Sequence, residues 1–401
     1  MIDLTFRTPE NIRISKTEGY WVYDDKGKRY LDITSGGSTF TLGYGNKRIA
    51  QAVYDSLTTV TRCHTPLGYR HNLIDEVSDF ICNSGGWSGF VWAITGTGAV
   101  EAAIGIADDY WKLLGENKPY IVAFKKGWHG TSALTKTLSG LNNNISHRTI
   151  LINSPIWTDP ANQWEKEKIT LKNLKQHLFE NKNIGIVLIN PSPWFNGVNV
   201  WSHSFLKELN KLRHEFKFLL ISDDIASCWG KSKAFHSHNT IFPPGIKPDI
   251  SCIGKAITAG YAPLSAAVVN NKVKHITRGH VSYGHTFQPY MAGIAAMKAT
   301  TDIILEEKLL ERSQTTEDRL SEIGNRLLKK GLIKSYRAFG LNIAYDIDEN
   351  INNERFLDLK KRTYGASGKY SDISALRITA PLNADEEYFG HLEDLLENVL
   401  K

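Results

Sequence analysis

Residues 249–261 read DISCIGKAITAGY and place a lysine directly after an apolar run. The run Ile250–Ile253 predicts a short buried strand, Gly254 ends it, and Lys255 follows at once. Small residues as far as Gly260 keep the space beside the lysine clear. Because a lysine is costly to remove from water, this position indicates either a chemical task or a side chain that reaches back to solvent. The surrounding sequence has to distinguish these two explanations.

Six further apolar runs have the length of buried parallel strands. They are Phe90–Ile94, Tyr120–Phe124, Arg148–Ile152, Ile184–Ile189, Phe218–Ser222 and Ala266–Val269. Helical patterns lie between several of them. The clearest repeats apolar residues at three- and four-residue spacing from Val100 to Leu114 and stops at Gly115. This alternation predicts an α/β fold with a mostly parallel, seven-stranded sheet.

The two ends of the chain depart from this pattern. Residues 20–33 predict a hairpin that turns at Asp25–Gly27. A final amphipathic helix is expected from about Asp385 to Leu400, with Asn383 as its cap and Glu386 three residues further on.

These patterns predict two domains. Residues 45–290 are expected to form a large domain, and residues 1–44 and 291–401 a smaller α+β domain built from both termini. The polar stretches LNNNIS (141–146) and GASGKYSD (365–372) are expected to be surface loops.

Composition narrows the class of protein. The 401 residues carry a net charge of +6 from 48 basic and 42 acidic side chains, with no basic arm, zinc-finger spacing or RNA-binding signature, so nucleic acid is not an expected partner. The four cysteines form no CxxC pair and the histidines show no metal-ligand spacing, which predicts reduced thiols and no metal site. No run reaches transmembrane length and the N-terminus has no apolar signal region, so we expect a cytoplasmic protein without membrane contact.

Ligands bind at the carboxyl ends of parallel strands, and several of those ends carry unusual residues. Thr95-Gly96-Thr97-Gly98 connects a strand directly to a helix, where bare N–H groups favour an anion such as phosphate. A tight structural turn is the alternative. A dinucleotide fingerprint would need a third glycine where Glu101 stands, so a nicotinamide dehydrogenase fits poorly.

Two acids and an aromatic residue end other strands. Asp223 and Asp224 close one strand; we expect Asp223 to be buried against a cation or proton donor and Asp224 to be a solvated loop acid. Trp128 and His129 follow another strand, where the indole fits either the core or the face of a planar ligand. An anion cradle, a buried acid, a stacking ring and a strand-end lysine match pyridoxal phosphate. That cofactor needs a phosphate site, a Schiff-base lysine and an acid against its pyridine nitrogen.

The chain resembles the class III aminotransferases, pyridoxal-phosphate enzymes of fold type I, from Gly19 to its C-terminus. The segments that carry the resemblance are TGTGAVEAA, GWHG, LLISDDIASCWGK, DISCIGKAITAGYAPLSAAVV, YGHTFQPYMAG and LRITAPL. Patches such as DDYW and PLSA are similar to the diaminopelargonic acid aminotransferase branch. SGGSTF (35–40), however, lacks the tryptophans which that branch places near its substrate.

The resemblance implies a role for each matching residue. Its cofactor residues are Gly96 and Thr97 at the phosphate, Trp128 with His129 at the ring, Ile225 packed on the ring, Asp223 at the pyridine nitrogen, Lys255 as the Schiff-base lysine and Thr286 at the phosphate of the neighbouring subunit. Its substrate residues are Arg377 for a carboxylate, Asn190, which stands where many members carry glutamate, and Phe40. Gly98 likewise replaces an acid that is common in the family.

The activity implied is transfer of an amino group from an amine or amino-acid donor to a keto acid, ketone or aldehyde acceptor. The chemistry would be ping-pong, through a Schiff base on Lys255 in a homodimer with shared active sites. An aminomutase, racemase or decarboxylase would keep Lys255 and Asp223, so these motifs leave such activities open. A non-catalytic module that only binds the cofactor is a more distant alternative.

Overall fold

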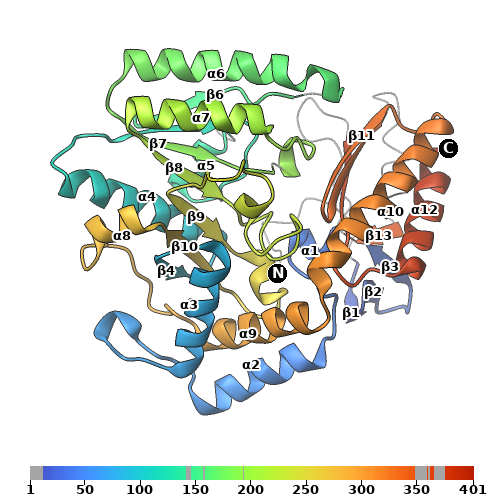
Figure 1. Cartoon of the computed structure of the whole chain (residues 1–401). Helices are drawn as coiled ribbons and strands as arrows, with labels where there is room; N and C mark the ends of the chain where they lie inside the picture. The colour runs from blue at the N-terminus through green and yellow to red at the C-terminus, as the bar shows by residue number, and fades with distance from the viewer. Residues whose placement is uncertain are drawn as a thin grey trace.

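A seven-stranded sheet lies at the centre of the computed structural model (Figure 1). The structure describes residues 12–140, 146–156, 159–192, 194–347, 359, 362–364 and 375–401. The strands, in spatial order, are β4 (Gly89–Ala93), β10 (Ser265–Val269), β9 (Ile250–Ile253), β8 (Leu219–Asp223), β7 (Ile184–Ile189), β5 (Tyr120–Phe124) and β6 (Thr149–Ile152). Strand β10 pairs antiparallel with both of its neighbours, and the strands from β9 to β6 run parallel. The predicted α/β fold and its mostly parallel sheet are confirmed.

Helices cover both faces of this sheet, and the alternation of side chains along β7 shows how. Ile186 and Leu188 pack in one core with α4 (Gly96–Leu113), whereas Val187 and Ile189 pack in another with α6 (Gln163–Glu180) and α7 (His203–Phe216). Burial on both faces explains why the parallel strands are continuous apolar runs. The short helices α5 (Ala133–Leu138) and α8 (Asn271–Thr277) lie on the α4 side.

Three helices form a further layer beside β4 and β10. Helices α2 (Lys47–Thr59), α3 (Asn72–Gly85) and α9 (Met291–Glu306) share one apolar core with strand residues such as Trp92 and Val268 (Figure 1). Among the described residues, no helix combines the length and the apolar composition needed to span a bilayer.

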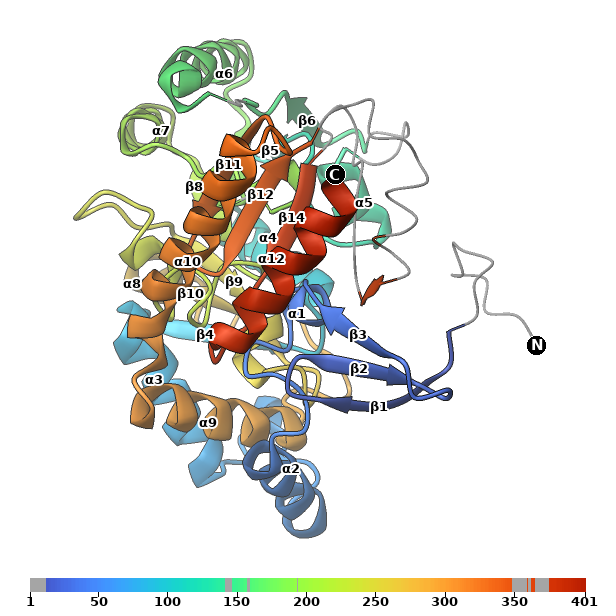
Figure 2. The same cartoon turned by 90° about the vertical axis from the view of Figure 1, so that its right-hand side faces the viewer.

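Segments from both ends of the chain share a separate core. Strands β1 (Ile14–Glu18), β2 (Trp21–Asp24), β3 (Arg29–Asp32) and β13 (Thr363–Tyr364) form one sheet, and β11 (Ser335–Phe339), β12 (Asn342–Asp346) and β14 (Ala375–Thr379) form another. Helices α10 (Leu309–Lys329) and α12 (Glu386–Leu400) lie side by side across the second sheet (Figure 2). Leu31 and Ile33 from the N-terminal part pack there with residues such as Leu392 from α12. The division of the chain at residues 44 and 290 stays a prediction.

The predicted hairpin is confirmed, whereas the predicted helix cap is wrong. Gly27 turns the hairpin with φ 79° and donates its N–H to the carbonyl of Asp24. Helix α12 is capped by Asp385, whose carboxylate accepts from the N–H of Tyr388 at 2.9 Å, because the helix begins only at Glu386. Asn383 instead donates to the carbonyl of Leu42. Of the two predicted surface loops, residues 141–145 and 365–372 lie outside the described residues.

Candidate active site

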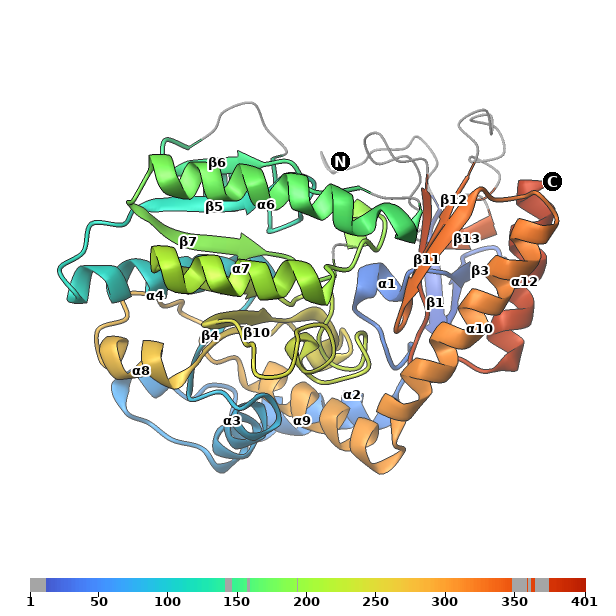
Figure 3. The same cartoon turned by 45° about the horizontal axis from the view of Figure 1, so that its top comes forward.

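The carboxyl ends of the parallel strands point toward α1 (Ser35–Ser38) and the sheets built from the chain ends (Figure 3). At this edge the structure brings together the predicted residues of four strand ends, and a cavity of about 380 Å³ opens there. Lys255, Thr95 and Gly96 line it together with Thr39 and Gly260. Chain segments that are far apart in the sequence therefore meet around one space.

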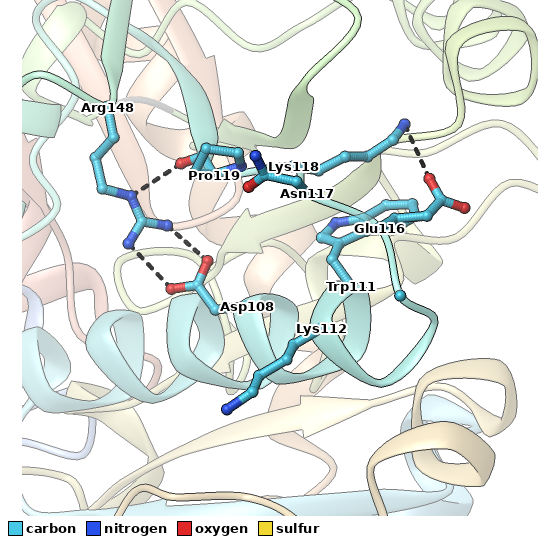
Figure 4. A pocket seen from close by; sticks show the side chains of 9 residues that line it. Asp108, Trp111, Lys112, Glu116, Asn117, Lys118, Pro119 and Arg148 are labelled. Atoms are coloured by element: carbon cyan, nitrogen blue, oxygen red, sulfur yellow. Dashed lines mark hydrogen bonds and ion pairs between the residues drawn. The ribbon is translucent and has the colours of Figure 1, made fainter.

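A surface hollow at the opposite edge of the sheet holds charged side chains, most of which pair with one another. It lies where β5 and β6 begin, and Arg148 there holds both carboxylate oxygens of Asp108, at 2.6 and 3.0 Å (Figure 4). Arg148 Nε also donates to the carbonyl of Pro119 at 2.9 Å. Because the Arg148 guanidinium already binds a carboxylate and a carbonyl, this hollow is not a candidate reaction site.

Lys255 occupies a strained position at the end of β9. Its φ of 49° lies in the left-handed region, which non-glycine residues adopt mainly where the surrounding structure holds them. The preceding residue has to be Gly254, because a Cβ there would lie 2.6 Å from Ser265 Oγ. Burial lowers the pKa of Lys255, and the nearby Asp223 carboxylate partly opposes that shift. The amine is therefore more easily available in its neutral, nucleophilic form than that of an exposed lysine.

Asp223 is held in place by His129. His129 Nδ1 lies 2.7 Å from Asp223 Oδ2, and both side chains are almost fully buried. The other carboxylate oxygen accepts from the N–H of Ile225 at 3.3 Å. The sequence placed His129 at the cofactor only through its neighbour Trp128, which is half-buried. In the structure the direct partner of His129 is the predicted pyridine acid.

Asp224 is not the solvated acid that the sequence predicted. It is 1% exposed, and its carboxylate accepts from the hydroxyl groups of Ser227 and Ser237 and from the N–H of Ser237. Burial raises the pKa of Asp224 to about 6. The prediction failed because a later loop folds over this carboxylate and supplies the donors that water would otherwise provide.

The segment Thr95–Gly98 forms the start of α4. Thr95 caps the helix by accepting from the N–H of Gly98 at 3.0 Å, and the other N–H groups of a first helical turn have no partner within the helix. A Cβ at Gly96 would lie 2.9 Å from Ile225 Cδ1, so this glycine lets Ile225 come close. Ile225 also lies against Gly254, which makes it a wall between the cradle and the lysine segment.

The resemblance implied an acid at the position of Gly98, and the structure shows what a side chain there would displace. A Cβ at Gly98 would lie 2.8 Å from the hydroxyl of Tyr283, which is itself 2.7 Å from His285 Nε2. Thr286, which follows in the same stretch, is exposed in this chain. Within this chain it is Tyr283 that lies over the start of α4.

Two of the three predicted substrate residues, Arg377 and Phe40, lie beside aromatic rings. Arg377, on β14, is 2% exposed, and its guanidinium carbon lies 4.5 Å from the centre of the Trp194 ring. Asn190 is buried at the end of β7, and its amide oxygen has no hydrogen-bond partner among the described residues. Phe40 packs on Tyr44, with ring centres 4.5 Å apart.

Sequence reasoning missed two buried charged residues beside these rings. Asp32 is 1% exposed and accepts from the N–H groups of Thr34 and Gly36 and from the hydroxyl of Tyr44. Lys231 is fully buried and donates to the carbonyl oxygens of Ser38 and Ile225 at 2.8 and 3.2 Å. No periodicity or motif marks either residue as buried. The stretch GKSK (230–233), which contains Lys231, resembles a solvated turn.

The chain is similar to known aminotransferases in sequence and in fold. A family model described as aminotransferase class-III matches residues 6–400. An ornithine aminotransferase of Staphylococcus carnosus is 28% identical over 407 residues, which cover 98% of this chain and 94% of that one. An adenosylmethionine-8-amino-7-oxononanoate aminotransferase of Staphylococcus aureus is 25% identical over 374 residues, covering 88% and 82%. The solved structure of an amine transaminase from an uncultivated Pseudomonas species, in its PLP-bound form, superposes with a TM-score of 0.88 at 19% identity and covers 100% of this chain and 99% of that chain.

Proposed function

The chain belongs to the class-III aminotransferases, whose family model spans residues 6–400, and on that premise we propose how its own residues carry out transamination. As a member of this family it is a pyridoxal-phosphate enzyme that moves an amino group between two small molecules, an amino donor and a carbonyl acceptor. Among the reactions that the sequence left open, the family match favours transamination.

The residues at the sheet edge fit this cofactor. A Cβ at Gly96 would collide with Ile225 and one at Gly254 with Ser265, so both glycines keep this region open, and Lys255 reaches the same cavity as the start of α4. Phosphate is suited to that helix start, where Gly96 and Thr97 are the proposed contacts. Trp128 and Ile225 are proposed to hold the two faces of the ring. When bound, pyridoxal phosphate supplies a protonated ring that stabilises negative charge at the substrate carbon.

Lys255 is the proposed covalent partner of the cofactor and the group that moves the proton. Its lowered pKa favours the neutral amine, which is the form that can attack a carbonyl carbon. With the cofactor bound, Lys255 Nζ would act first as the base that takes the proton from the substrate carbon and then as the acid that gives it back.

Asp223 is proposed to keep the pyridine nitrogen protonated, and His129 to keep Asp223 in position. A carboxylate oxygen bound to His129 at 2.7 Å cannot rotate freely, so the other oxygen keeps a fixed direction. The observation that carries the whole proposal is that Lys255 and Asp223 end the neighbouring strands β9 and β8, with the Lys255 amine in the field of the Asp223 carboxylate.

Arg377 and Asn190 are proposed to bind the carboxylate of an acidic substrate, with Phe40 against its side group. The indole of Trp194 lies on the Arg377 guanidinium in this structure, so that role requires Trp194 to turn aside. In that role Asn190 would donate to the carboxylate through its amide nitrogen, because its unpaired amide oxygen only accepts and cannot neutralise a cation.

We also propose a cytoplasmic homodimer in which Thr286 completes the phosphate site of the partner subunit. Thr286 is exposed, and Phe287 beside it is 63% exposed. Tyr54, Leu67 and Tyr69 are exposed by similar fractions, 63%, 68% and 65%, and large apolar side chains of this kind favour an interface. All four cysteines are free, in keeping with a reducing compartment.

Borohydride reduction of the holoenzyme tests the proposal. The reagent should fix the cofactor to one peptide, and mass spectrometry should locate it on Lys255. Lys255→Ala should bind the cofactor without a covalent bond and show no turnover. A label on Lys231 or Lys233 would overturn the assignment. A donor and acceptor screen, followed by the absorbance of the bound cofactor, then identifies the substrates.

A further inference from the structure

A second cavity, of about 590 Å³, lies next to the one that holds Lys255. Its walls include Val22, Gly36, Gly37, Phe40, Tyr44 and Trp194. Phe40 lies between the two cavities at this point, because its ring lines the second cavity and lies against Gly260, where a Cβ would come within 2.8 Å of it, and Gly260 lines the lysine cavity. A molecule whose reacting carbon is at Lys255 therefore has this second space within reach of its other end.

None of the described residues that line the second cavity carries a charge. Two charged groups that lie behind its wall, Asp32 and Arg377, already have partners. Asp32 accepts four hydrogen bonds, one of them from the Tyr44 hydroxyl at 2.8 Å, and Arg377 lies beneath the Trp194 ring. While Trp194 covers Arg377, as in this structure, a carboxylate in this cavity would lose water without gaining a charged partner, whereas an aryl or alkyl group would be stabilised by burial.

A left-handed turn keeps the cavity open. Ser35, Gly36, Gly37 and Ser38 all have positive φ values, from 48° to 73°. A Cβ at Gly37 would meet nothing within 4 Å, so this residue leaves open space, while one at Gly36 would collide with Phe40. Two consecutive glycines at this point thus widen the cavity that larger residues would narrow.

Buried hydrogen bonds fix that turn from three sides. Asp32 Oδ2 accepts from the N–H of Gly36 at 2.6 Å, Lys231 Nζ donates to the carbonyl of Ser38 at 2.8 Å, and Ser35 Oγ donates to the carbonyl of Thr379 at 2.9 Å. Four positive φ values in succession persist only under such constraints, so the cavity is preorganised before any substrate arrives.

We infer that this cavity takes the uncharged apolar or aromatic group of one substrate, an amine or its matching ketone, during transamination. The inference rests on the proposed function, since it requires the reacting carbon to lie at Lys255. An acidic partner substrate would then bind in a different manner from the apolar one.

Three amines that share one reacting centre test the inference with the holoenzyme. Butan-2-amine, 4-phenylbutan-2-amine and 4-aminopentanoate differ only in the group remote from the amino carbon. Calorimetry with the three matching ketones measures binding without turnover. We expect the phenyl ketone to bind on the order of 10- to 100-fold more tightly than butan-2-one, and 4-oxopentanoate to show no such gain.

Two variants on β1 then locate the phenyl group. Thr17 lines the cavity and pairs across the hairpin with Val22, so Thr17→Trp should fill the space and abolish the preference for phenyl. Lys16 is the adjacent exposed residue, whose side chain points to the other face of the strand, so Lys16→Trp should keep the preference. A preference for 4-oxopentanoate, or a phenyl preference that survives Thr17→Trp, would overturn the inference.

The reaction of butan-2-amine separates this result from the proposed function. It should convert the bound cofactor in wild type and in both variants, since its small group needs no second cavity. Failure of all three amines to change the cofactor absorbance would contradict transamination of amines itself, whatever the ketone affinities.

Discussion

The ammonium group of Lys231 lies 2.8 Å from the carbonyl oxygen of Ser38, although the two residues are 193 positions apart and both are buried. The same Nζ donates to the carbonyl of Ile225, which is proposed to pack on the cofactor. One side chain therefore joins the left-handed turn of the second cavity to the strand end that carries Asp223. The geometry of the cavity and that of the cofactor site are linked through this lysine.

Lys231→Met should remove this link. Two buried carbonyl oxygens would lose a donor, which costs about 1 to 3 kcal/mol each in the free energy of unfolding. We expect weaker binding of 4-phenylbutan-2-one, measured by calorimetry, with borohydride labelling of Lys255 retained. Lys329→Met, at an exposed position on α10, is the matched control and should change neither quantity.

The pH dependence of stability should report the burial of Lys231 directly. Burial lowers its pKa from 10.5 to about 7, so between these values the unfolded chain binds a proton that the folded chain does not. The free energy of unfolding of wild type, relative to Lys231→Met, should therefore rise with pH between about 7 and 10.5. A difference that stays flat across this window in urea titrations would show that the amine is not desolvated.

Asp223→Asn should lower activity, whereas Asp224→Asn should lower stability. Asp223→Asn removes the charge proposed to hold the ring proton, and kcat should fall roughly 100-fold or more. Asp224→Asn should leave kcat nearly unchanged, but its amide would put donors against the donors of Ser227 and Ser237 and destabilise the fold. Steady-state kinetics measures the change in kcat, and urea unfolding measures the change in stability. A larger loss of kcat from Asp224→Asn than from Asp223→Asn would contradict the assignment of Asp223 to the pyridine nitrogen.

The contribution of Asp224 to the free energy of unfolding should also decrease as the pH rises from acid to neutral. Its folded pKa of about 6 lies above the ordinary 3.8, so its contribution is fully present below that ordinary value and is lost as the pH rises through 6. Asp224→Asn has no group to titrate there. The difference in unfolding free energy between wild type and this variant should therefore decrease between about pH 4 and pH 6.

Gly98→Ala should weaken cofactor binding through Tyr283. The added Cβ would lie 2.8 Å from the Tyr283 hydroxyl, so the ring or the start of α4 has to shift. Removing that hydroxyl with Tyr283→Phe should restore much of the affinity for pyridoxal phosphate, measured by fluorescence titration of the apoenzyme. Tyr283→Phe alone is the control. If the double variant binds no better than Gly98→Ala, the collision lies elsewhere.

A mixture of inactive subunits should recover activity if Thr286 serves the partner's site. One chain carries Lys255→Ala and the other Thr286→Glu, which places a negative charge near the phosphate. Random reassortment gives mixed dimers in about half of the molecules, each with one intact site of two, so activity should approach about a quarter of wild type. Verified subunit exchange without recovery, or a monomer in light scattering, would contradict the shared site.

Local patterns were sufficient for much of the fold. The strand Ile184–Ile189 was predicted with its observed bounds, because a strand buried on both faces is an uninterrupted apolar run that needs no knowledge of its neighbours. The meeting of Lys255, Asp223 and Gly96 was also predictable, since the carboxyl ends of parallel strands lie at one edge of a sheet.

The sequence by itself thus determined the sheet, the strand-end residues and the family. The tertiary structure alone decided which polar side chains are buried and what they contact. Asp224 is enclosed by a later loop, Lys231 reaches a turn 193 residues away, and Trp194, from the segment after β7, lies over Arg377 on β14. Hydrophobic periodicity is a property of neighbouring residues, whereas desolvation and hydrogen bonding depend on whichever segments fold against a side chain. For that reason the shape and the uncharged lining of the second cavity could be seen only in the folded chain.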